Sequence, residues 1–210
     1  MDARERILGA IRRALDGSGR PARPDAPPKV PAPSYRTPLP GSLSEQFAMM
    51  HERVHGTLDK VDDLAGVPRA VCRYLQNLSG PPRIGRSRDP VFSSINWEGV
   101  DVEGRAASRE DRCSVTMAFA GIAETGTVAM VSSASSPITS HFLPEVNIAA
   151  LKQSRLVPAM EDLWPLIAEQ PRTVNLISGP SKTADIEQTI VYGAHGPRHF
   201  HVILVCDGDA

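Results

Sequence analysis

A glutamate that lies between glycines, in the segment Gly121–Thr127, is the first group whose type and spacing could do chemistry. The segment reads GIAETGT and precedes an apolar stretch. A backbone bend between glycines can project a carboxylate into a cleft and leave amides facing an anion. Such a carboxylate can act as a nucleophile or a general base; the alternative is a plain turn with a solvated glutamate. We take Glu124 as a candidate catalytic residue and Thr125, Gly126 and Thr127 as candidate ligand-binding residues.

A second polar segment, SGPSKTADIE at residues 178–187, follows the apolar run Val174–Ile177. Its hydroxyls and amides are therefore expected at the carboxyl end of a strand, where ligands bind in open α/β sheets. A lysine with neighbouring hydroxyls could bind a carboxylate or a phosphate. The spacing does not match the phosphate loop of nucleotide hydrolases, and a capped turn is the alternative. The candidate ligand-binding residues are Gly179, Ser181, Lys182, Thr183 and Asp185.

A histidine between glycines marks a third segment, YGAHGP at residues 192–197, directly before the last apolar run. The glycines leave the ring accessible, and histidine exchanges protons near neutral pH. We take His195 as a candidate catalytic residue and Gly196 as a candidate ligand-binding residue, with a structural role as the alternative. The nearby His199 and His201 are not obvious metal partners, because strand alternation puts both on one face only if pairing begins at His199.

The string His51–His55 matches the zinc motif HExxH by its letters. On a helix, two histidines four residues apart can bind one zinc ion, with the glutamate as general base. Here Val54 and Leu58 mark the centre of an apolar stripe, and Arg53 adds a charge. No third ligand follows at a suitable spacing. We therefore expect solvated or half-buried histidines on a helix, and no metal site.

Composition limits the class of protein. The 210 residues are 41% hydrophobic with a formal net charge of −1, which allows a sizeable core and gives no ground for a nucleic-acid partner or an anionic membrane. Cys72, Cys113 and Cys206 lie far apart without a CxxC pair, so the sequence indicates neither an iron–sulfur site nor another cofactor. No apolar run reaches the roughly 18 residues of a membrane span, and a signal peptide is not indicated. These features predict a cytoplasmic protein with reduced thiols.

The apolar pattern predicts an α/β fold. Spacings of three and four predict helices from Ser42 through Val61, over Val67–Leu78 and over Pro158–Glu169. Short apolar runs predict strands at Arg83–Gly85, Ser114–Ala118, Thr127–Ser132, Asn147–Leu151, Thr173–Ile177 and His201–Cys206. Between Pro90 and Arg109 the pattern does not place strands. Strands that alternate with helices favour a largely parallel sheet sandwiched by helices.

The first 40 residues form a different region. Residues 2–16 predict an amphipathic helix with a narrow apolar stripe. Eight prolines between Pro21 and Pro40 predict a semi-extended tether. We therefore divide the chain into an N-terminal helix and tether, 1–40, and an α/β domain, 41–210. The helix either docks on a partner or folds back on its own domain.

Together and in order, GIAETGTV, SGPSKTADIE and YGAHGP resemble the lactate utilisation protein C family with its LUD domain, also called DUF162. The Leu143-Pro144 step into Val146–Ile148 resembles that family too, and the likeness covers residues 80–206. It implies a NagB/RpiA/CoA transferase-like fold. It also implies a component of a bacterial system that oxidises L-lactate to pyruvate beside iron–sulfur partner proteins, which would hold any cluster. The leading hypothesis is an accessory subunit that binds a small anionic metabolite.

The same resemblance leaves open whether the chain is an enzyme. In related CoA transferases a glutamate is the nucleophile, so Glu124 could serve a free-standing acyl or CoA transferase or an isomerase. A folate cyclo-ligase-like ATP enzyme is a third alternative, although the phosphate-binding sequence is incomplete. Many relatives carry an arginine before the Leu-Pro step, where this chain has Pro137–His141. If that arginine binds a substrate carboxylate, this chain must use another group, such as His141 or Lys182, or bind its substrate differently.

Overall fold

The computed structural model describes residues 2–16, 40–78, 84–97, 100, 102–108, 110–168, 171–183 and 191–207. The chain divides into two units, Met1–Thr37 and Pro38–Ala210. In the first unit, α1 (Ala3–Asp16) confirms the predicted N-terminal helix, and its apolar stripe of Ile7, Leu8, Ile11 and Leu15 is exposed. The predicted tether lies almost entirely outside the described residues, and the division at residue 40 stays a prediction.

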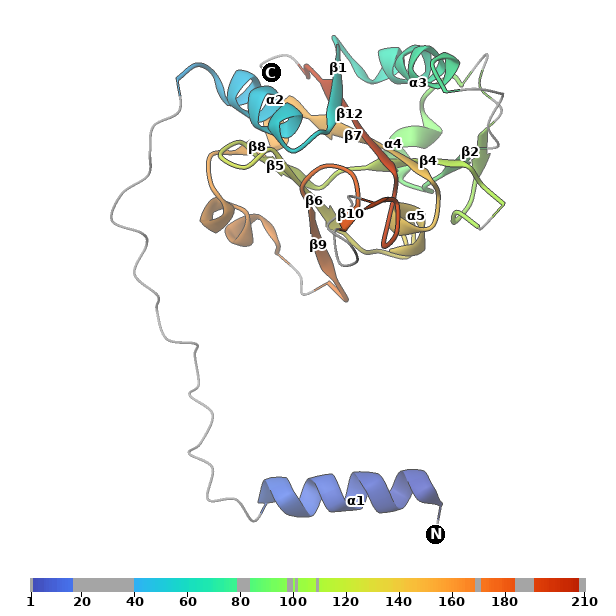
Figure 1. Ribbon diagram of the computed structural model, residues 1–210, viewed down its shortest axis with the longest axis vertical. Helices are drawn as coiled ribbons and strands as arrows, with labels where there is room; N and C mark the ends of the chain where they lie inside the picture. Colours follow the sequence, from blue (N-terminus) through green and yellow to red (C-terminus); the bar gives the residue numbers. More distant parts are fainter. Residues whose placement is uncertain are drawn as a thin grey trace. The chain divides into compact units, whose positions relative to one another are not determined.

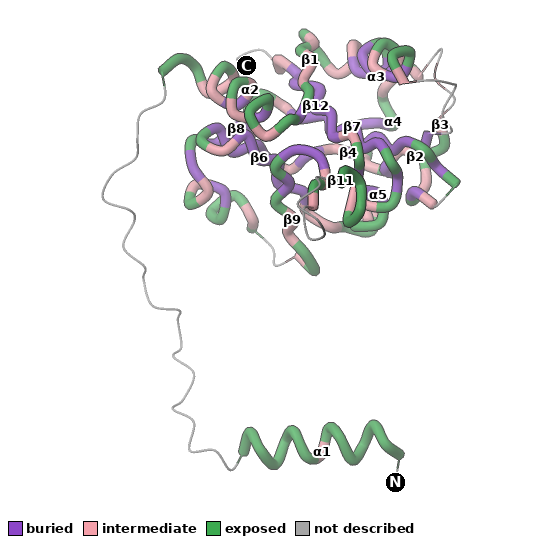
Figure 2. The backbone as a smooth tube through the Cα atoms, in the orientation of Figure 1, coloured by how far each residue is buried: buried purple, intermediate pink, exposed green. Residues whose placement is uncertain are grey.

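The second unit is built on a six-stranded sheet in which every pair of neighbours is parallel. The strands, in their order across the sheet, are β1 (Thr57–Val61), β12 (His199–Val205), β7 (Val146–Lys152), β4 (Cys113–Met117), β2 (Ile84–Arg86) and β3 (Val102–Gly104). Figure 1 shows β12, β7 and β4 side by side at the centre, and Figure 2 shows them as buried. Their nearly continuous apolar runs are typical of parallel strands covered on both faces.

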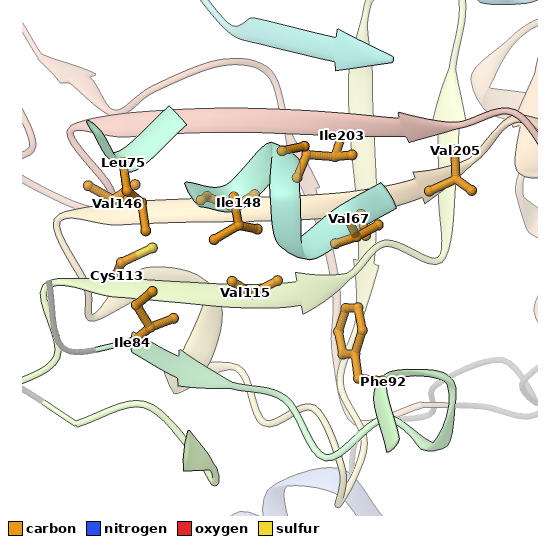
Figure 3. Packing of buried hydrophobic residues seen from close by; sticks show 13 residues of the cluster. Val67, Leu75, Ile84, Phe92, Cys113, Val115, Val146, Ile148, Ile203 and Val205 are labelled. Atoms are coloured by element: carbon orange, nitrogen blue, oxygen red, sulfur yellow. The ribbon is translucent and has the colours of Figure 1, made fainter. Parts of the chain in front are cut away.

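One face of this sheet is covered by α3 (Val67–Gln76) and the short α4 (Pro90–Ser93). The apolar positions of α3 recur every four residues, at Val67, Val71 and Leu75, and all three are buried. In Figure 3, Val67 and Leu75 lie against side chains of β7, β12 and β4. The predicted helix over Val67–Leu78 is confirmed.

The opposite face is covered by α2 (Leu43–Arg53) and by a second sheet, with α5 (Thr139–Phe142) beside it. The second sheet has the order β8 (Leu156–Val157), β5 (Ala120–Ile122), β6 (Thr127–Val131) and β9 (Val174–Ile177). A capping box begins α2, since Ser42 Oγ accepts from the Glu45 amide and Glu45 accepts from the Ser42 amide. The largely parallel sheet flanked by helices is therefore as predicted, whereas the second sheet was not foreseen.

One predicted helix is correct only in its first part, and another is wrong. The helix predicted from Ser42 through Val61 ends at Arg53, and the remaining apolar residues form β1. The chain leaves the helix through His55, whose φ is 66°, and Gly56, whose amide donates to the His51 carbonyl and where a Cβ would lie 2.1 Å from the His51 ring. The helix predicted over Pro158–Glu169 is instead two short 3-10 turns, η3 (Met160–Asp162) and η4 (Trp164–Leu166). Pro165 lacks the amide that a continuous α-helix needs.

The remaining short elements are η1 (Leu64–Gly66), η2 (Gln153–Arg155), β10 (Lys182–Thr183) and β11 (Val191–Tyr192). No helix in the described part of the chain has both the length and the apolar character needed to cross a bilayer.

Candidate functional site

The first two predicted segments meet through a chain of hydroxyls. Gly121–Thr127 forms strand β5 and the turn that leads into β6, and β6 pairs antiparallel with β9. This pairing brings Thr127 next to Ser178, with 2.7 Å between their hydroxyl oxygens. Thr125 Oγ1 donates to Thr127 Oγ1 at 2.7 Å. Three hydroxyls from two segments that are far apart in the sequence therefore form one row at the junction of β6 and β9.

The end of α2 holds both segments in place. The carbonyl of Gly126 accepts from His51 Nδ1 at 2.8 Å, and a Cβ on Gly126 would lie 2.2 Å from the His51 amide nitrogen. A Cβ on Gly179 would lie 2.2 Å from the Val54 carbonyl oxygen, which also accepts from Lys182 Nζ at 2.9 Å. Both glycines have positive φ, 63° and 73°. Only glycine satisfies both demands, so the contacts of these residues serve packing on α2.

The two histidines of the HExxH string do not share a helix face. His51 is fully buried and stacks on Phe47, and burial lowers its pKa. His55 lies beyond the end of α2, is exposed and has a φ of 66°. The expectation of solvated or half-buried histidines on a helix is therefore wrong for His51, which is fully buried; His55 is solvated as expected but lies beyond the helix.

Glu124 lies on the turn between β5 and β6 and is exposed. Its amide donates to the Pro158 carbonyl at 3.1 Å. The neighbouring Ile122 and Ala123 are fully buried in the core. The apolar residues beside Glu124 therefore do not enclose its carboxylate.

The second and third segments are joined at Ser181. Its amide donates to Pro197, its carbonyl accepts from Gly193, and its hydroxyl oxygen accepts from the His195 amide at 3.2 Å. The antiparallel pair β10 and β11 closes this loop, with Lys182 opposite Tyr192 and Thr183 opposite Val191. Asp185 lies outside the described residues.

His195 and Gly196 line a cavity of about 850 Å³, which we call the amino-edge cavity. Arg112, Glu145 and Arg198 also line it, and each directly precedes a strand of the main sheet. Glu124 and Ser181 are not among its lining residues. The first segment thus contacts the second, and the second contacts the third, but Glu124 and His195 do not share this cavity.

Residues 178–187 were expected at the carboxyl edge of a parallel sheet. That expectation is wrong, because the preceding strand, β9, belongs to the second sheet, where it pairs antiparallel.

A second cavity, of about 390 Å³, opens at the carboxyl ends of the parallel strands β4 and β7. We call it the carboxyl-edge cavity. Its polar lining residues are Asp89, Ser133, Ser136, Lys152 and Arg155, and its apolar lining residues are Met117, Ala118, Phe119 and Val131. This is the edge at which ligands bind in open parallel sheets, and the cavity lies within the size range of small-ligand sites.

The cationic side of the carboxyl-edge cavity comes from β7 and the turn after it. Lys152 ends β7, and Arg155 ends η2. Arg155 Nε donates to the Phe119 carbonyl at 3.0 Å, and its guanidinium lies 4.7 Å from the centre of the Phe119 ring. These two contacts hold the guanidinium plane at the cavity wall. The single carboxylate, Asp89, accepts from the Val91 amide at the start of α4.

The hydroxyl side comes from the loop after β6. The Ser136 amide donates to Ser133 Oγ at 2.9 Å, and Arg88 donates its amide to the Ser135 carbonyl. Ser136 Oγ lies 3.1 Å from His141 Nε2. The sequence reasoning missed this loop; the cluster of four serines in Ser132–Ser136, directly after an apolar strand, was the available signal.

His141, one of the two residues considered for a substrate carboxylate, is not cationic at neutral pH. It is fully buried, and burial lowers its pKa to about 4. The imidazole is therefore neutral at pH 7 and cannot supply a cation to a substrate carboxylate.

A buried polar network positions α5. The Asn147 side chain donates to Ser114 Oγ at 2.8 Å and to the Ser140 carbonyl at 3.3 Å. Ser114 Oγ also donates to the Ser140 carbonyl, and the Ala107 amide donates to Ser140 Oγ. This network connects α5, which carries His141, to the amino-terminal ends of β4 and β7.

Known proteins of similar sequence have the same type of domain. The family model described as LUD domain matches residues 73–205. Lactate utilization protein C of Geobacillus kaustophilus (strain HTA426) is 39% identical, over 97% of this chain and 94% of the relative. The protein of that name from Bacillus subtilis (strain 168) is 28% identical, over 97% and 96%. That from Geobacillus thermodenitrificans (strain NG80-2) is 40% identical over 124 residues, 55% of this chain and 49% of the relative.

A solved structure has the same fold. The crystal structure of a DUF162 family protein from Deinococcus radiodurans aligns with a TM-score of 0.55 at 21% identity, over 80% of this chain and 100% of that chain. Family model, relatives and fold agree, and the chain therefore belongs to the LUD domain family.

Proposed function

We propose that the protein is a component of a lactate utilisation system that oxidises L-lactate to pyruvate. In this proposal it binds a small organic anion and works beside iron–sulfur partner proteins as an accessory subunit. The names of the relatives support a role in lactate utilisation. The proposed anion site extends this role to a specific place on the molecule.

The observation that carries the proposal is the charge of the carboxyl-edge cavity. Lys152 and Arg155 line one small cavity together with two serines. Ammonium and guanidinium groups only donate hydrogen bonds, and such charged bonds to a carboxylate are stronger than neutral ones. The apolar residues of the same wall suit the short carbon chain of a three-carbon acid.

We assign electron transfer to partner proteins on the basis of the cysteines. Cys113 is fully buried in the core beneath α3, and burial raises the pKa of its thiol. Within the described ranges, no three His, Cys, Asp or Glu side chains gather where they could hold a metal ion. A cluster that accepts electrons from lactate is therefore proposed for the partners, which co-purification from lactate-grown cells would identify.

Removing both cations is expected to abolish function while the fold remains. Each charged contact to a bound carboxylate contributes on the order of 1.5 to 3 kcal/mol, or about tenfold or more in affinity. A deletion strain that is supplied with the Lys152→Met, Arg155→Met double variant should therefore still fail to grow on L-lactate. The matched control replaces Lys60, an exposed residue on β1: the Lys60→Met variant should restore growth of the deletion strain. Full growth of the double variant would contradict the proposal.

Glu124 separates the proposal from the transferase alternative. Because this carboxylate is exposed on a turn, Glu124→Gln is expected to change growth on lactate and anion affinity by less than about twofold. A free-standing transferase that uses Glu124 as nucleophile would instead lose turnover by several orders of magnitude. The measurement is growth on L-lactate in parallel with an acyl-CoA transfer assay of the purified chain.

A further inference from the structure

The carboxyl-edge cavity contains a serine whose hydroxyl is paired with a buried histidine. We infer that Ser136 donates a hydrogen bond to a small monocarboxylate in this cavity, and that His141 is the positioning residue that directs the Ser136 hydroxyl toward it. The inference rests on the proposed function, since it assumes that the cavity binds an anion. It adds the class of ligand and the residues that select it.

The position of the proton on His141 is the first step. The neutral ring carries one proton, on either Nδ1 or Nε2. Nε2 lies 3.1 Å from Ser136 Oγ, whereas Nδ1 is buried without a hydrogen-bond partner in the described part of the chain. A proton on Nδ1 would leave a buried N–H donor unpaired, which is rarer in proteins than an unpaired acceptor. The proton is therefore on Nε2, which donates to Ser136 Oγ.

Another buried histidine follows the same rule. His51 Nδ1 faces the Gly126 carbonyl, which can only accept, so the proton is on Nδ1. The nitrogen without a hydrogen-bond partner in the described part of the chain, His51 Nε2, is therefore the unprotonated acceptor.

The direction of the Ser136 hydroxyl follows. A hydroxyl oxygen that accepts from His141 keeps its own proton for another acceptor. Ser136 is only 5% exposed and lines the cavity beside Lys152 and Arg155. The wall thus offers an ammonium, a guanidinium and a hydroxyl donor, against one carboxylate, Asp89, which accepts from the Val91 amide. The two cations outnumber this carboxylate, and the donors match a ligand that only accepts, namely an ionised carboxylate or a phosphate.

The apolar half of the wall decides between these two anions. Met117, Ala118 and Val131 also line the cavity, and their side chains carry neither a charge nor a hydrogen-bond donor. A phosphate presents oxygens on all sides, and some of these would face apolar carbon without a donor. A monocarboxylate with a short carbon chain satisfies both halves. The predicted ligand class is therefore a small monocarboxylate, such as pyruvate or L-lactate, in preference to inorganic phosphate.

Calorimetric titration of the full-length protein with pyruvate, L-lactate and inorganic phosphate tests the inference. Ser136→Ala and His141→Leu should each weaken pyruvate binding by about five- to tenfold. His141→Gln, whose amide can replace the Nε2 donor, should remain within about twofold of the wild type. The double variant Ser136→Ala with His141→Leu should be no weaker than either single variant, because both act through one hydrogen bond. Phosphate should bind more weakly than pyruvate.

Several results would overturn the inference. These are unchanged affinity in Ser136→Ala, equal losses in His141→Gln and His141→Leu, or phosphate binding as tight as that of pyruvate. If only the Lys152 and Arg155 variants lose binding, the proposed function stands and the role of Ser136 and His141 is wrong. No binding of any anion to the wild type contradicts both. Nitrogen-15 NMR of the wild-type histidines needs no variant: a proton on His141 Nδ1 would refute the argument directly.

Discussion

Replacing Arg105 with methionine is expected to lower the free energy of unfolding by about 3 kcal/mol. Its guanidinium binds both carboxylate oxygens of Asp111, at 2.5 and 2.6 Å, and the Asp111 side chain has no exposed surface. Arg105 holds the pKa of Asp111 below its usual range. Without the guanidinium, the buried carboxylate loses two charged hydrogen bonds, while its bonds from the Ser108 amide and hydroxyl remain. The measurement is urea unfolding of the purified variant at pH 7.

An exposed ion pair provides the control for this experiment. Arg112 and Glu145 lie 3.4 Å apart with side chains 42% and 41% exposed, and such pairs contribute about 0 to 1 kcal/mol. Arg112→Met should therefore change the unfolding free energy by less than about 1 kcal/mol. Adding Asp111→Asn to Arg105→Met should recover part of the loss, because it removes the negative charge from a buried side chain. Equal effects of the two arginine variants would contradict this interpretation.

Acidification from pH 7.5 to pH 5 is expected to lower the free energy of unfolding by about 4 kcal/mol. Burial lowers the folded-state pKa of His141 and of His201 to about 4, from an ordinary value of 6.5. The unfolded chain therefore binds protons first as the pH falls through 6.5. Stability contributed by the neutral rings is complete above that pH and is lost progressively toward pH 4. Each ring accounts for about 2 kcal/mol at pH 5.

Urea unfolding at half-unit steps of pH measures this dependence. His201→Gln should remove about half of it, whereas His55→Gln, at an exposed position, should leave it unchanged. Carboxylates with a lowered pKa, such as Asp111 and Asp207, act in the same direction but titrate mainly below pH 5. A flat profile between pH 7.5 and 5 would mean that both histidines are accessible to water.

The central strands of the main sheet, β4, β7 and β12, could be predicted because they are short, largely apolar runs. The strands β6 and β9 of the second sheet were predicted as well, but not that they form a sheet of their own. Their neighbours β5 and β8 have three and two residues, too few for a periodic pattern. The error after Arg53 had a different cause. Leu58 and Val61 continue the helical spacing of three and four, but the helix ends in a turn in which His55 has a φ of 66° and the Gly56 amide donates to the His51 carbonyl.

The candidate site, too, could be predicted from the sequence only in part. The need for glycine at Gly126 and Gly179 could be read from their flanking residues, but both contact α2, which no local pattern reveals. The carboxyl-edge cavity forms where β4, β6 and β7 end. Its serines and cations come from separate segments with no shared spacing, so only the topology brings them together.

The central claim is that an anion binds at the carboxyl edge of the sheet and not at the amino edge. The most direct measurement is calorimetric titration of pyruvate into three proteins: the wild type, Lys152→Met with Arg155→Met, and Arg112→Met with Arg198→Met. We expect the affinity for pyruvate to fall by about 100-fold or more in Lys152→Met with Arg155→Met. The variant Arg112→Met with Arg198→Met, which removes two cations of the amino-edge cavity, should bind pyruvate like the wild type. The opposite result, with binding lost in the Arg112 and Arg198 variant and retained in the Lys152 and Arg155 variant, would contradict the claim.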